Sequence, residues 1–122
     1  MSTTQLDIRT LDKELNTMIL SGQIMEGFEK FYAEDCIMRE NSEEPRVGKD
    51  ANREIEKAFV DSIEEFHGAE LLASAVSGDV SFSEWAMDVT FKGAGRVQMA
   101  QAAVRRWKDG QVAEERFYYN KG

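Results

Sequence analysis

Cysteine, proline and histidine are almost absent from this chain of 122 residues, which holds one of each: Cys36, Pro45 and His67. A single cysteine excludes an internal disulfide and fits a reducing, cytoplasmic environment. One cysteine and one histidine also give no zinc-type ligand spacing, so we expect no metal site. Cys36 follows an aromatic stretch and precedes Ile37, which predicts a small buried hydrophobic residue rather than a nucleophile.

Basic charge and long apolar runs are scarce as well. The chain has 15 Lys and Arg against 23 Asp and Glu, a net charge of −8. Because phosphate groups bind to basic surfaces, this balance argues against nucleic acid and anionic membranes as partners. No apolar run reaches the length of a membrane span, and the N-terminal residues lack the features of a signal peptide. The glycines of "KGAGR" at 92–96 lie between strand-like runs and predict a hairpin rather than a cofactor loop.

The first part of the chain shows helical periodicity. Apolar residues recur at helical spacing from a start near Thr10 until "SGQ" at 21–23 breaks the pattern, and a second, shorter stripe covers 24–32. A strand is predicted over 36–41, where Met38 and Glu40 share one face.

The middle of the chain predicts a loop followed by a third helix. The segment "NSEEPRVGKD" at 41–50 holds the only proline and predicts a loop. Asp50 can cap the next helix, over 51–66. The inner face of this helix is apolar: Ile55, Phe59 and Ile63.

Strand-like periodicity takes over in the second half. Four runs are separated by turns, at 69–76, 80–91, 96–107 and 112–119. The dipeptide Asp109-Gly110 is a strong hairpin signal between the last two. The chain as a whole, 1–122, therefore predicts one α+β domain with the order α-α-β-α-β-β-β-β. We expect three N-terminal helices to pack into a strongly curved, mostly antiparallel sheet.

Alternation assigns faces in only one of these long strands. In the run over 80–91, the apolar residues of one face are Trp85, Met87, Val89 and Phe91, and the opposite face is more polar. The first set should face the helices. In the last two strands the alternation alone does not decide which face points inward.

Three stretches carry a resemblance to a known family. They are "FYAEDCIMREN" at 31–41, "EPRVGKDANREIEKAF" at 44–59 and "RRWKDGQVAEERFYY" at 105–119. In this order and spacing they resemble the SnoaL-like branch of the nuclear transport factor 2-like superfamily, and the match covers nearly the whole chain. The resemblance implies a cone-like fold in which a bent sheet wraps around helices and leaves an apolar cavity open at one end.

The resemblance also implies which residues line this cavity. It turns Ala103, Arg105 and Trp107 inward on one strand and Glu115, Phe117 and Tyr119 inward on the last. The expected ligand is a small hydrophobic molecule, and no cofactor is expected. The ligand-binding residues that we predict are Met38, Trp85, Met87, Arg105, Phe117 and Tyr119.

Two glutamates are the candidate catalytic groups, Glu40 and Glu115. The resemblance places Glu40 where ketosteroid isomerases carry their general-base aspartate. A carboxylate in an apolar cavity has a raised pKa, which makes it a competent acid or base near neutral pH. Arg105 and Glu115 can reach the same cavity. Either the two carboxylates share a catalytic site, or Arg105 neutralises one of them in a structural network.

The chain departs from the characterised active sites of the superfamily. The two oxyanion donors of ketosteroid isomerases map near Leu15 and Ala103. The acid of SnoaL-type polyketide cyclases maps to Phe117, and the Asp-Arg-Asp set of limonene-epoxide hydrolases maps to about Met87, Trp85 and Phe117. None of these characterised active sites is therefore complete in this chain.

Three functions stay open. The first is an isomerase, cyclase or hydrolase acting on a small hydrophobic carbonyl compound, with Glu40 as general base. The second is a non-catalytic binding module for a small apolar or aromatic ligand, and the third is a dimeric interaction scaffold. The resemblance implies a homodimer through the outer sheet face. The residues expected on that face, beside complementary charges, are Ala100, Ala102, Val104, Val112 and Tyr118.

Overall fold

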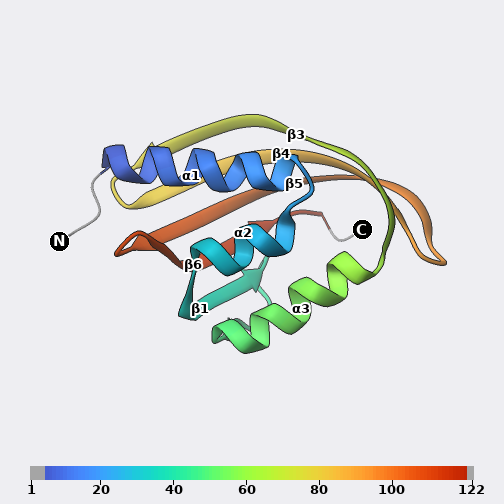
Figure 1. Cartoon of the computed structure of the whole chain (residues 1–122), viewed down its shortest axis with the longest axis horizontal. Helices are drawn as coiled ribbons and strands as arrows, with labels where there is room; N and C mark the ends of the chain where they lie inside the picture. The colour runs from blue at the N-terminus through green and yellow to red at the C-terminus, as the bar shows by residue number, and fades with distance from the viewer. Residues whose placement is uncertain (1–4, 121–122) are drawn as a thin grey trace.

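A curved sheet wraps around three helices in the computed structural model, which describes the backbone of residues 5–120 and the side chains from residue 7 onward (Figure 1). The elements in chain order are α1 (Gln5–Leu20), α2 (Ile24–Phe31), β1 (Tyr32–Glu40), β2 (Arg46–Val47), α3 (Lys49–Asp61), β3 (Ile63–Ser77), β4 (Val80–Phe91), β5 (Gly95–Lys108) and β6 (Gln111–Tyr118). The six strands form one sheet in the order β2-β1-β6-β5-β4-β3. The predicted α+β fold is confirmed.

The sheet is antiparallel except at one pairing. β1 runs parallel to β6, whereas β3, β4, β5 and β6 pair as an antiparallel meander. The β5–β6 hairpin turns at Asp109 and Gly110, which have φ angles of 52° and 79°. Positive φ at both central turn residues matches the twist of the flanking strands, which explains the Asp-Gly signal. Figure 1 shows α1 lying along the concave side of the sheet, with α2 and α3 beside β1.

Some predicted boundaries were wrong. The segment predicted as a loop contains the short strand β2, in which Val47 pairs with Ile37. Asp50 does not cap α3, because Gly48 occupies the N-cap position with φ 98°. The helix ends at Asp61, and the Ser62 hydroxyl at the C-cap donates to the Phe59 carbonyl at 2.6 Å.

Early termination of α3 moves one predicted residue to another element. Ile63, expected on the inner face of the helix, begins β3 and pairs with Phe91. The apolar run over 51–66 therefore divides between a helix and a strand, which periodicity over a few residues cannot separate.

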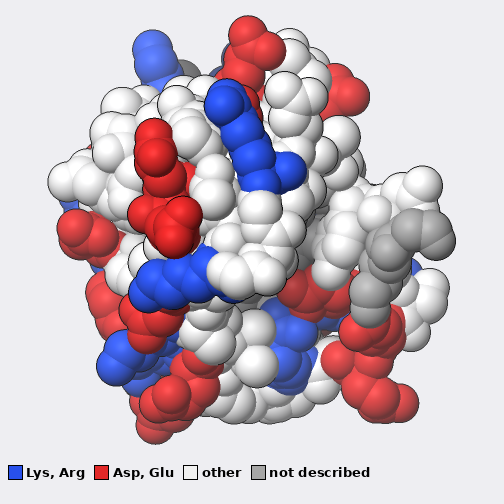
Figure 2. All heavy atoms as spheres, turned by 90° about the vertical axis from the view of Figure 1, so that its right-hand side faces the viewer, with Lys and Arg blue, Asp and Glu red and all other residues white. Residues whose placement is uncertain are grey.

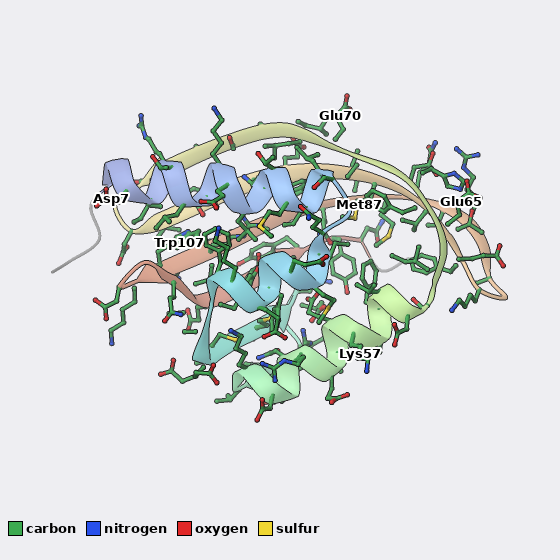
Figure 3. The ribbon with its side chains drawn as sticks, viewed as in Figure 1. Asp7, Lys57, Glu65, Glu70, Met87 and Trp107 are labelled. Atoms are coloured by element: carbon green, nitrogen blue, oxygen red, sulfur yellow. The ribbon has the colours of Figure 1, made fainter. Side chains whose placement is uncertain are left out.

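The inward faces predicted for the long strands are present. On β4, Trp85, Met87 and Val89 are buried, and on β5 Ala103 and Trp107 are buried. Figure 3 shows Met87 and Trp107 pointing into the space between the sheet and the helices. The main core cluster joins the helices to β1, β5 and β6: Ile8, Leu15, Phe28, Phe31, Tyr32, Ala33, Cys36, Met38, Trp107 and Val112.

Val112 corrects the prediction for the outer face. It is fully buried, because the β5–β6 register shifts between Arg106 and Trp107: Trp107 pairs with Val112, but Arg106 pairs with Glu114. Ala113 is the extra residue of this β-bulge, which reverses the alternation on its N-terminal side. Beyond the bulge, Arg106 and Glu114 form a cross-strand ion pair at 3.6 Å. The homodimer through this face stays a prediction.

Cys36 is buried as predicted, beside the side chain of Asn52. The Asn52 amide donates to the carbonyls of Cys36, Arg46 and Gly48 at 3.2, 3.0 and 2.9 Å. Its oxygen accepts a bond from Arg46 Nε at 3.2 Å. This one side chain ties α3 to β1 and β2 and fixes the position of Arg46.

Figure 2 shows acidic and basic side chains interspersed on one end of the molecule. Within residues 5–120, no helix is both long enough and apolar enough to cross a membrane.

Candidate functional site

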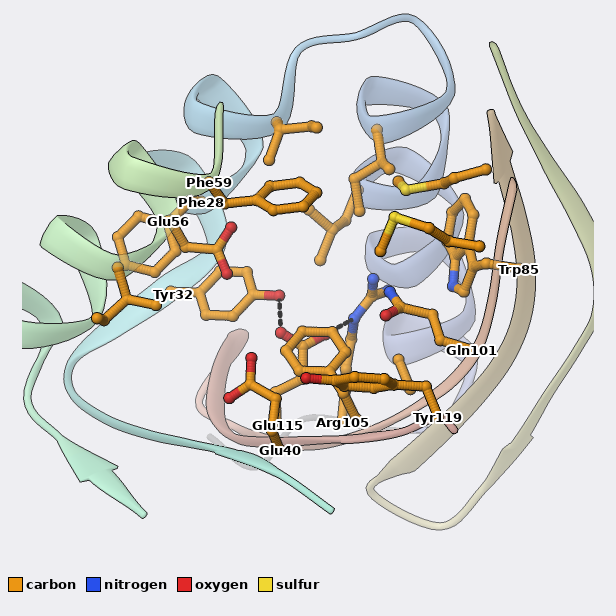
Figure 4. A pocket seen from close by; sticks show the side chains of 18 residues that line it. Phe28, Tyr32, Glu40, Glu56, Phe59, Trp85, Gln101, Arg105, Glu115 and Tyr119 are labelled. Carbon is orange, nitrogen blue, oxygen red and sulfur yellow. Dashed lines mark hydrogen bonds and ion pairs between the residues drawn. The ribbon is translucent and has the colours of Figure 1, made fainter. Parts of the chain in front are cut away.

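A cavity of about 310 Å³ lies between the concave face of the sheet and the helices. Its walls are mainly apolar, with side chains from α1, α2 and α3 on one side and from β4, β5 and β6 on the other (Figure 4). The predicted site residues that line it are Glu40, Trp85, Met87, Arg105, Glu115, Phe117 and Tyr119.

Met38 is placed elsewhere. It is 1% exposed and belongs to the core cluster, and it is not among the residues that line the cavity. The alternation correctly puts Met38 on the same side of β1 as Glu40. It does not say how far along the strand the cavity extends.

The polar end of the cavity is built around Glu115. The Tyr32 hydroxyl donates to Glu115 Oε1, and Arg105 Nε donates to Glu115 Oε2 at 2.8 Å. Arg105 and Glu115 are directly opposite on β5 and β6, and each is 2% exposed. Burial, reinforced by the charge of Glu115, raises the pKa of Tyr32 well above its ordinary value. The phenol therefore keeps its proton and acts as a donor to the carboxylate.

Arg105 continues this system toward α1. Its Nη1 donates to Asp12 Oδ1 at 2.8 Å and to Asn16 Oδ1 at 2.6 Å. Burial alone would lower the pKa of Arg105, but the charges of Glu115 and Asp12 outweigh it and raise the pKa. We call these residues, Tyr32, Glu115, Arg105, Asp12 and Asn16, the Arg105 network.

The far end of the Arg105 network is closed by the sheet. The Ser81 hydroxyl donates to Asp12 Oδ1 at 2.8 Å and accepts a bond from the Trp107 indole at 2.9 Å. A buried charge is stable only when it is paired and hydrogen-bonded, and here each charged group has several partners. Arg105 was expected either to leave Glu115 free for catalysis or to neutralise it in a structural network. The contacts of Glu115 match the structural network.

Glu40 lies outside the Arg105 network. Its Oε2 forms an ion pair with Arg46 Nη1 at 2.5 Å, and the two side chains are 22% and 24% exposed. Arg46 is held in turn by Asn52. The candidate general base therefore faces the cavity with a cation at its side.

Glu56 is a third carboxylate at this cavity, and sequence reasoning missed it. It projects from α3 into the cavity, across from Glu40 and Glu115 (Figure 4). Among the described residues, no hydrogen bond or ion pair holds its carboxylate. Desolvation, with the like charges of Glu115 and Glu40, raises the pKa of Glu56 to about 7. Glu56 is thus poised to gain or lose a proton at neutral pH.

The missed residues left weak signals in the sequence. Glu56 follows Asn52 by four residues and precedes Phe59 by three, so all three share one helical face. Asp12 and Asn16 are also four residues apart, on the buried side of α1. Polar residues embedded in an apolar helical face were the available clue.

No group of three or more His, Cys, Asp or Glu within the described residues could hold a metal ion. The cavity offers carboxylates that are already paired with arginines, apart from Glu56. The arrangement thus provides apolar walls, a fixed polar end and one carboxyl group with a shifted pKa. Such a site can hold a small molecule and exchange a proton with it.

Comparison with known proteins agrees on the fold. A protein from Mesorhizobium loti, provisionally described as a SnoaL-like polyketide cyclase [carbohydrate phosphatase], is 30% identical, with a TM-score of 0.82 over 92% of this chain and 98% of that one. No curated protein matches the chain in sequence.

Two more distant structures share the fold alone. One, from Catenulispora acidiphila, is a hypothetical protein with a ketosteroid isomerase-like fold in complex with trimethylamine (15% identity, TM-score 0.73, 88% of this chain and 86% of that one). The other, from Burkholderia pseudomallei, is a nuclear transport factor 2-like protein of unknown function (12% identity, TM-score 0.78, 93% and 91%). The sequence model of the SnoaL-like domain matches residues 6–119, and the chain belongs to the SnoaL-like family.

Proposed function

We propose that the protein binds a small, largely apolar molecule in the cavity and transfers a proton to or from it through Glu56. The observation that carries this proposal is the Glu56 carboxylate, which faces the cavity without a partner and has a pKa of about 7. An acid–base group is most effective when its pKa lies near the working pH.

Glu56 fits this role better than Glu40, the group first expected from the resemblance. Glu40 Oε2 is already held in an ion pair with Arg46 Nη1. Glu115 is bonded by both Tyr32 and Arg105, so its oxygens already hold donors. We propose that Glu40 and Glu115 act on Glu56 electrostatically, because their negative charges raise its pKa.

The reaction that this site fits is proton transfer beside the carbonyl of a small hydrophobic compound, as in an isomerase, cyclase or hydrolase. Abstraction of a proton from carbon leaves charge on the carbonyl oxygen, and that charge needs a donor. The Tyr32 hydroxyl and the Gln101 amide are donors on the cavity wall. Tyr32 would have to exchange Glu115 for the ligand oxygen as its acceptor.

Proton transfer can be tested without the natural substrate. Exchange of the methyl protons of acetophenone for deuterium in D2O is followed by NMR, with the wild type, Glu56→Gln and Glu54→Gln. Glu54 is an exposed carboxylate on the same helix, so its variant matches the change in charge. Loss of a general base slows exchange by about 10²–10⁴-fold, and we expect this loss in Glu56→Gln only.

Two other results would contradict the assignment. Exchange that is lost in Glu40→Gln but kept in Glu56→Gln would return the general-base role to Glu40. No acceleration by the wild type, for a ketone that NMR titration shows to bind, would leave binding without proton transfer.

Binding without chemistry is the second candidate. It is favoured by the hydrogen-bond donors of the cavity wall that already have protein acceptors. The Tyr32 hydroxyl, the Trp85 indole and the Arg105 guanidinium all donate to protein acceptors: Glu115, Ser83 and Asp12 among them. An oxyanion that took its hydrogen bond from one of these three groups would have to displace the existing bond, which costs free energy that a catalytic site ordinarily avoids.

A further inference from the structure

We propose that the cavity selects a small organic cation, an amine with an apolar substituent, over a neutral or anionic molecule of the same shape. This inference rests on the proposed function because it concerns the ligand of the same cavity. Three independent features of the walls lead to it: the direction of the hydrogen bonds, the balance of charge, and the aromatic rings.

The hydrogen bonds at the cavity run from protein donors to protein acceptors. Tyr32 and Arg105 donate to the two oxygens of Glu115, and the Trp85 indole donates to Ser83 Oγ at 2.8 Å. Among the described residues, the one buried side-chain nitrogen without an acceptor is Arg46 Nη2, and Arg46 does not line the cavity. For a ligand, the Glu56 carboxylate offers an acceptor that no donor within the described part of the chain occupies, and the Gln101 amide, which also lines the cavity, offers both donors and an acceptor. A ligand that donates hydrogen bonds fits this wall.

The charge balance has the same sense. Glu40, Glu56 and Glu115 line the cavity, and Arg105 is the lining cation. Arg105 is shared between Glu115 and Asp12, because it bonds both carboxylates. Arg46 pairs with Glu40 from outside the lining. Among the described residues, Glu56 therefore has no ion-pair partner. Its negative charge repels an anionic ligand and attracts a cationic one, and the attraction is stronger inside the cavity than in bulk water.

The aromatic rings of the cavity suit a cation as well. The rings that line it are Phe28, Tyr32, Phe59, Trp85, Phe117 and Tyr119. The face of an aromatic ring carries partial negative charge, and it attracts a desolvated cation placed over it. Figure 4 shows Phe28, Phe59, Tyr32 and Glu56 on one side of the cavity and Trp85 and Gln101 on the other. Rings and a carboxylate together form the usual surroundings of an alkylammonium group.

Two molecules of the same shape separate charge from size. Phenyltrimethylammonium and tert-butylbenzene differ only in the central atom of the substituent, nitrogen or carbon, and benzoate supplies an anionic counterpart. NMR titration of the wild type at pH 8 gives the affinity for each. We expect the cation to bind at least about tenfold more tightly than tert-butylbenzene, and benzoate to bind more weakly than either.

Variants of α3 locate the source of the preference. In Glu56→Gln we expect the affinity for phenyltrimethylammonium to fall by about tenfold, while that for tert-butylbenzene is unchanged. Glu54→Gln removes the same charge from the exposed side of α3 and should bind both like the wild type. The wild-type comparison stands by itself if a variant does not fold.

The pH dependence gives a further check. Ionised groups facing Glu56 are Glu40 on β1, Glu115 on β6 and Arg46 on β2, and the Tyr32 phenol lies beside them. The pKa of Glu56 is raised to about 7. Cation affinity should therefore rise from pH 6 to pH 8 as Glu56 ionises, and should be flat in Glu56→Gln.

The outcomes distinguish this inference from the proposed function. If tert-butylbenzene binds as tightly as the cation, or if Glu56→Gln keeps the cation preference, the inference is overturned and the apolar cavity stands. If none of the three compounds binds, both the inference and the proposed binding function fail.

Discussion

Glu115 and Glu56 face one cavity from opposite walls, and the protein treats them in opposite ways. Glu115, on β6, accepts bonds from Tyr32 and Arg105 and is 2% exposed. Glu56, on α3, has no such partner among the described residues, and its pKa rises to about 7. The difference lies in the neighbours that each backbone element supplies, since the two side chains are chemically identical.

This contrast separates a structural charge from a functional one. Removing a partner from a buried, fully bonded network leaves an uncompensated charge, so such a network holds the fold together. An unpartnered carboxylate at a cavity weakens the fold at neutral pH, and proteins retain such groups mainly where a ligand or a reaction uses them. The predictions below test this division of roles.

Breaking the Arg105 network should have the largest effect. Arg105→Met leaves the buried carboxylates of Glu115 and Asp12 without their cation. We expect the free energy of unfolding, measured by urea denaturation at pH 7, to fall by about 3–5 kcal/mol. The matched control is Arg96→Met, because Arg96 forms a two-bond ion pair with Asp88 at the surface. Its loss should cost much less, because solvent and salt screen an exposed pair. Equal effects in the two variants would refute the structural role of the network.

Glu56→Gln should have an intermediate effect, which depends on pH. The pKa of Glu56 rises from 4.5 to about 7 on folding, so the folded protein binds an extra proton between these values. The stability that this proton provides is present in full below pH 4.5 and is lost as the pH rises through 7. The wild type should lose up to about 3 kcal/mol relative to Glu56→Gln over this window.

The difference between the two unfolding curves isolates Glu56 from the other titrating groups. Glu54→Gln should show no such pH-dependent difference from the wild type. A constant offset between wild type and Glu56→Gln from pH 4.5 to 8 would mean that Glu56 is not desolvated as the structure indicates.

Glu40→Gln should have the smallest effect. Its ion pair with Arg46 is partly exposed, and such pairs contribute about 0.5–1 kcal/mol. A double-mutant cycle with Arg46→Met measures the coupling at pH 7. A gain in stability would place Glu40 with Glu56 as an unsupported carboxylate. A loss of about 2 kcal/mol or more would place it with Glu115.

The sequence predicted which side chains of several strands point inward, but it did not predict how far the cavity extends along each strand. Alternation on β4 correctly turned Trp85 and Met87 toward the helices. The resemblance correctly turned Arg105 and Glu115 inward. Alternation fixes only direction, so it could not show that Met38 lies in the core, beyond the lining of the cavity. The network partner Asp12 was missed because a polar residue within an amphipathic helix ordinarily faces solvent.

Local patterns in the chain by themselves determined the element order, the α+β class and the Asp109-Gly110 hairpin, because turn chemistry and periodicity act over a few residues. Only the tertiary structure decided which charges meet. With regular pairing from this turn, Arg105 would lie opposite Glu114, but the bulge at Ala113 brings Glu115 there instead. The same shift buries Val112. Likewise, Glu56 is unpartnered only because α3 packs across the cavity from Arg105, and such long-range placement depends on packing of the whole chain.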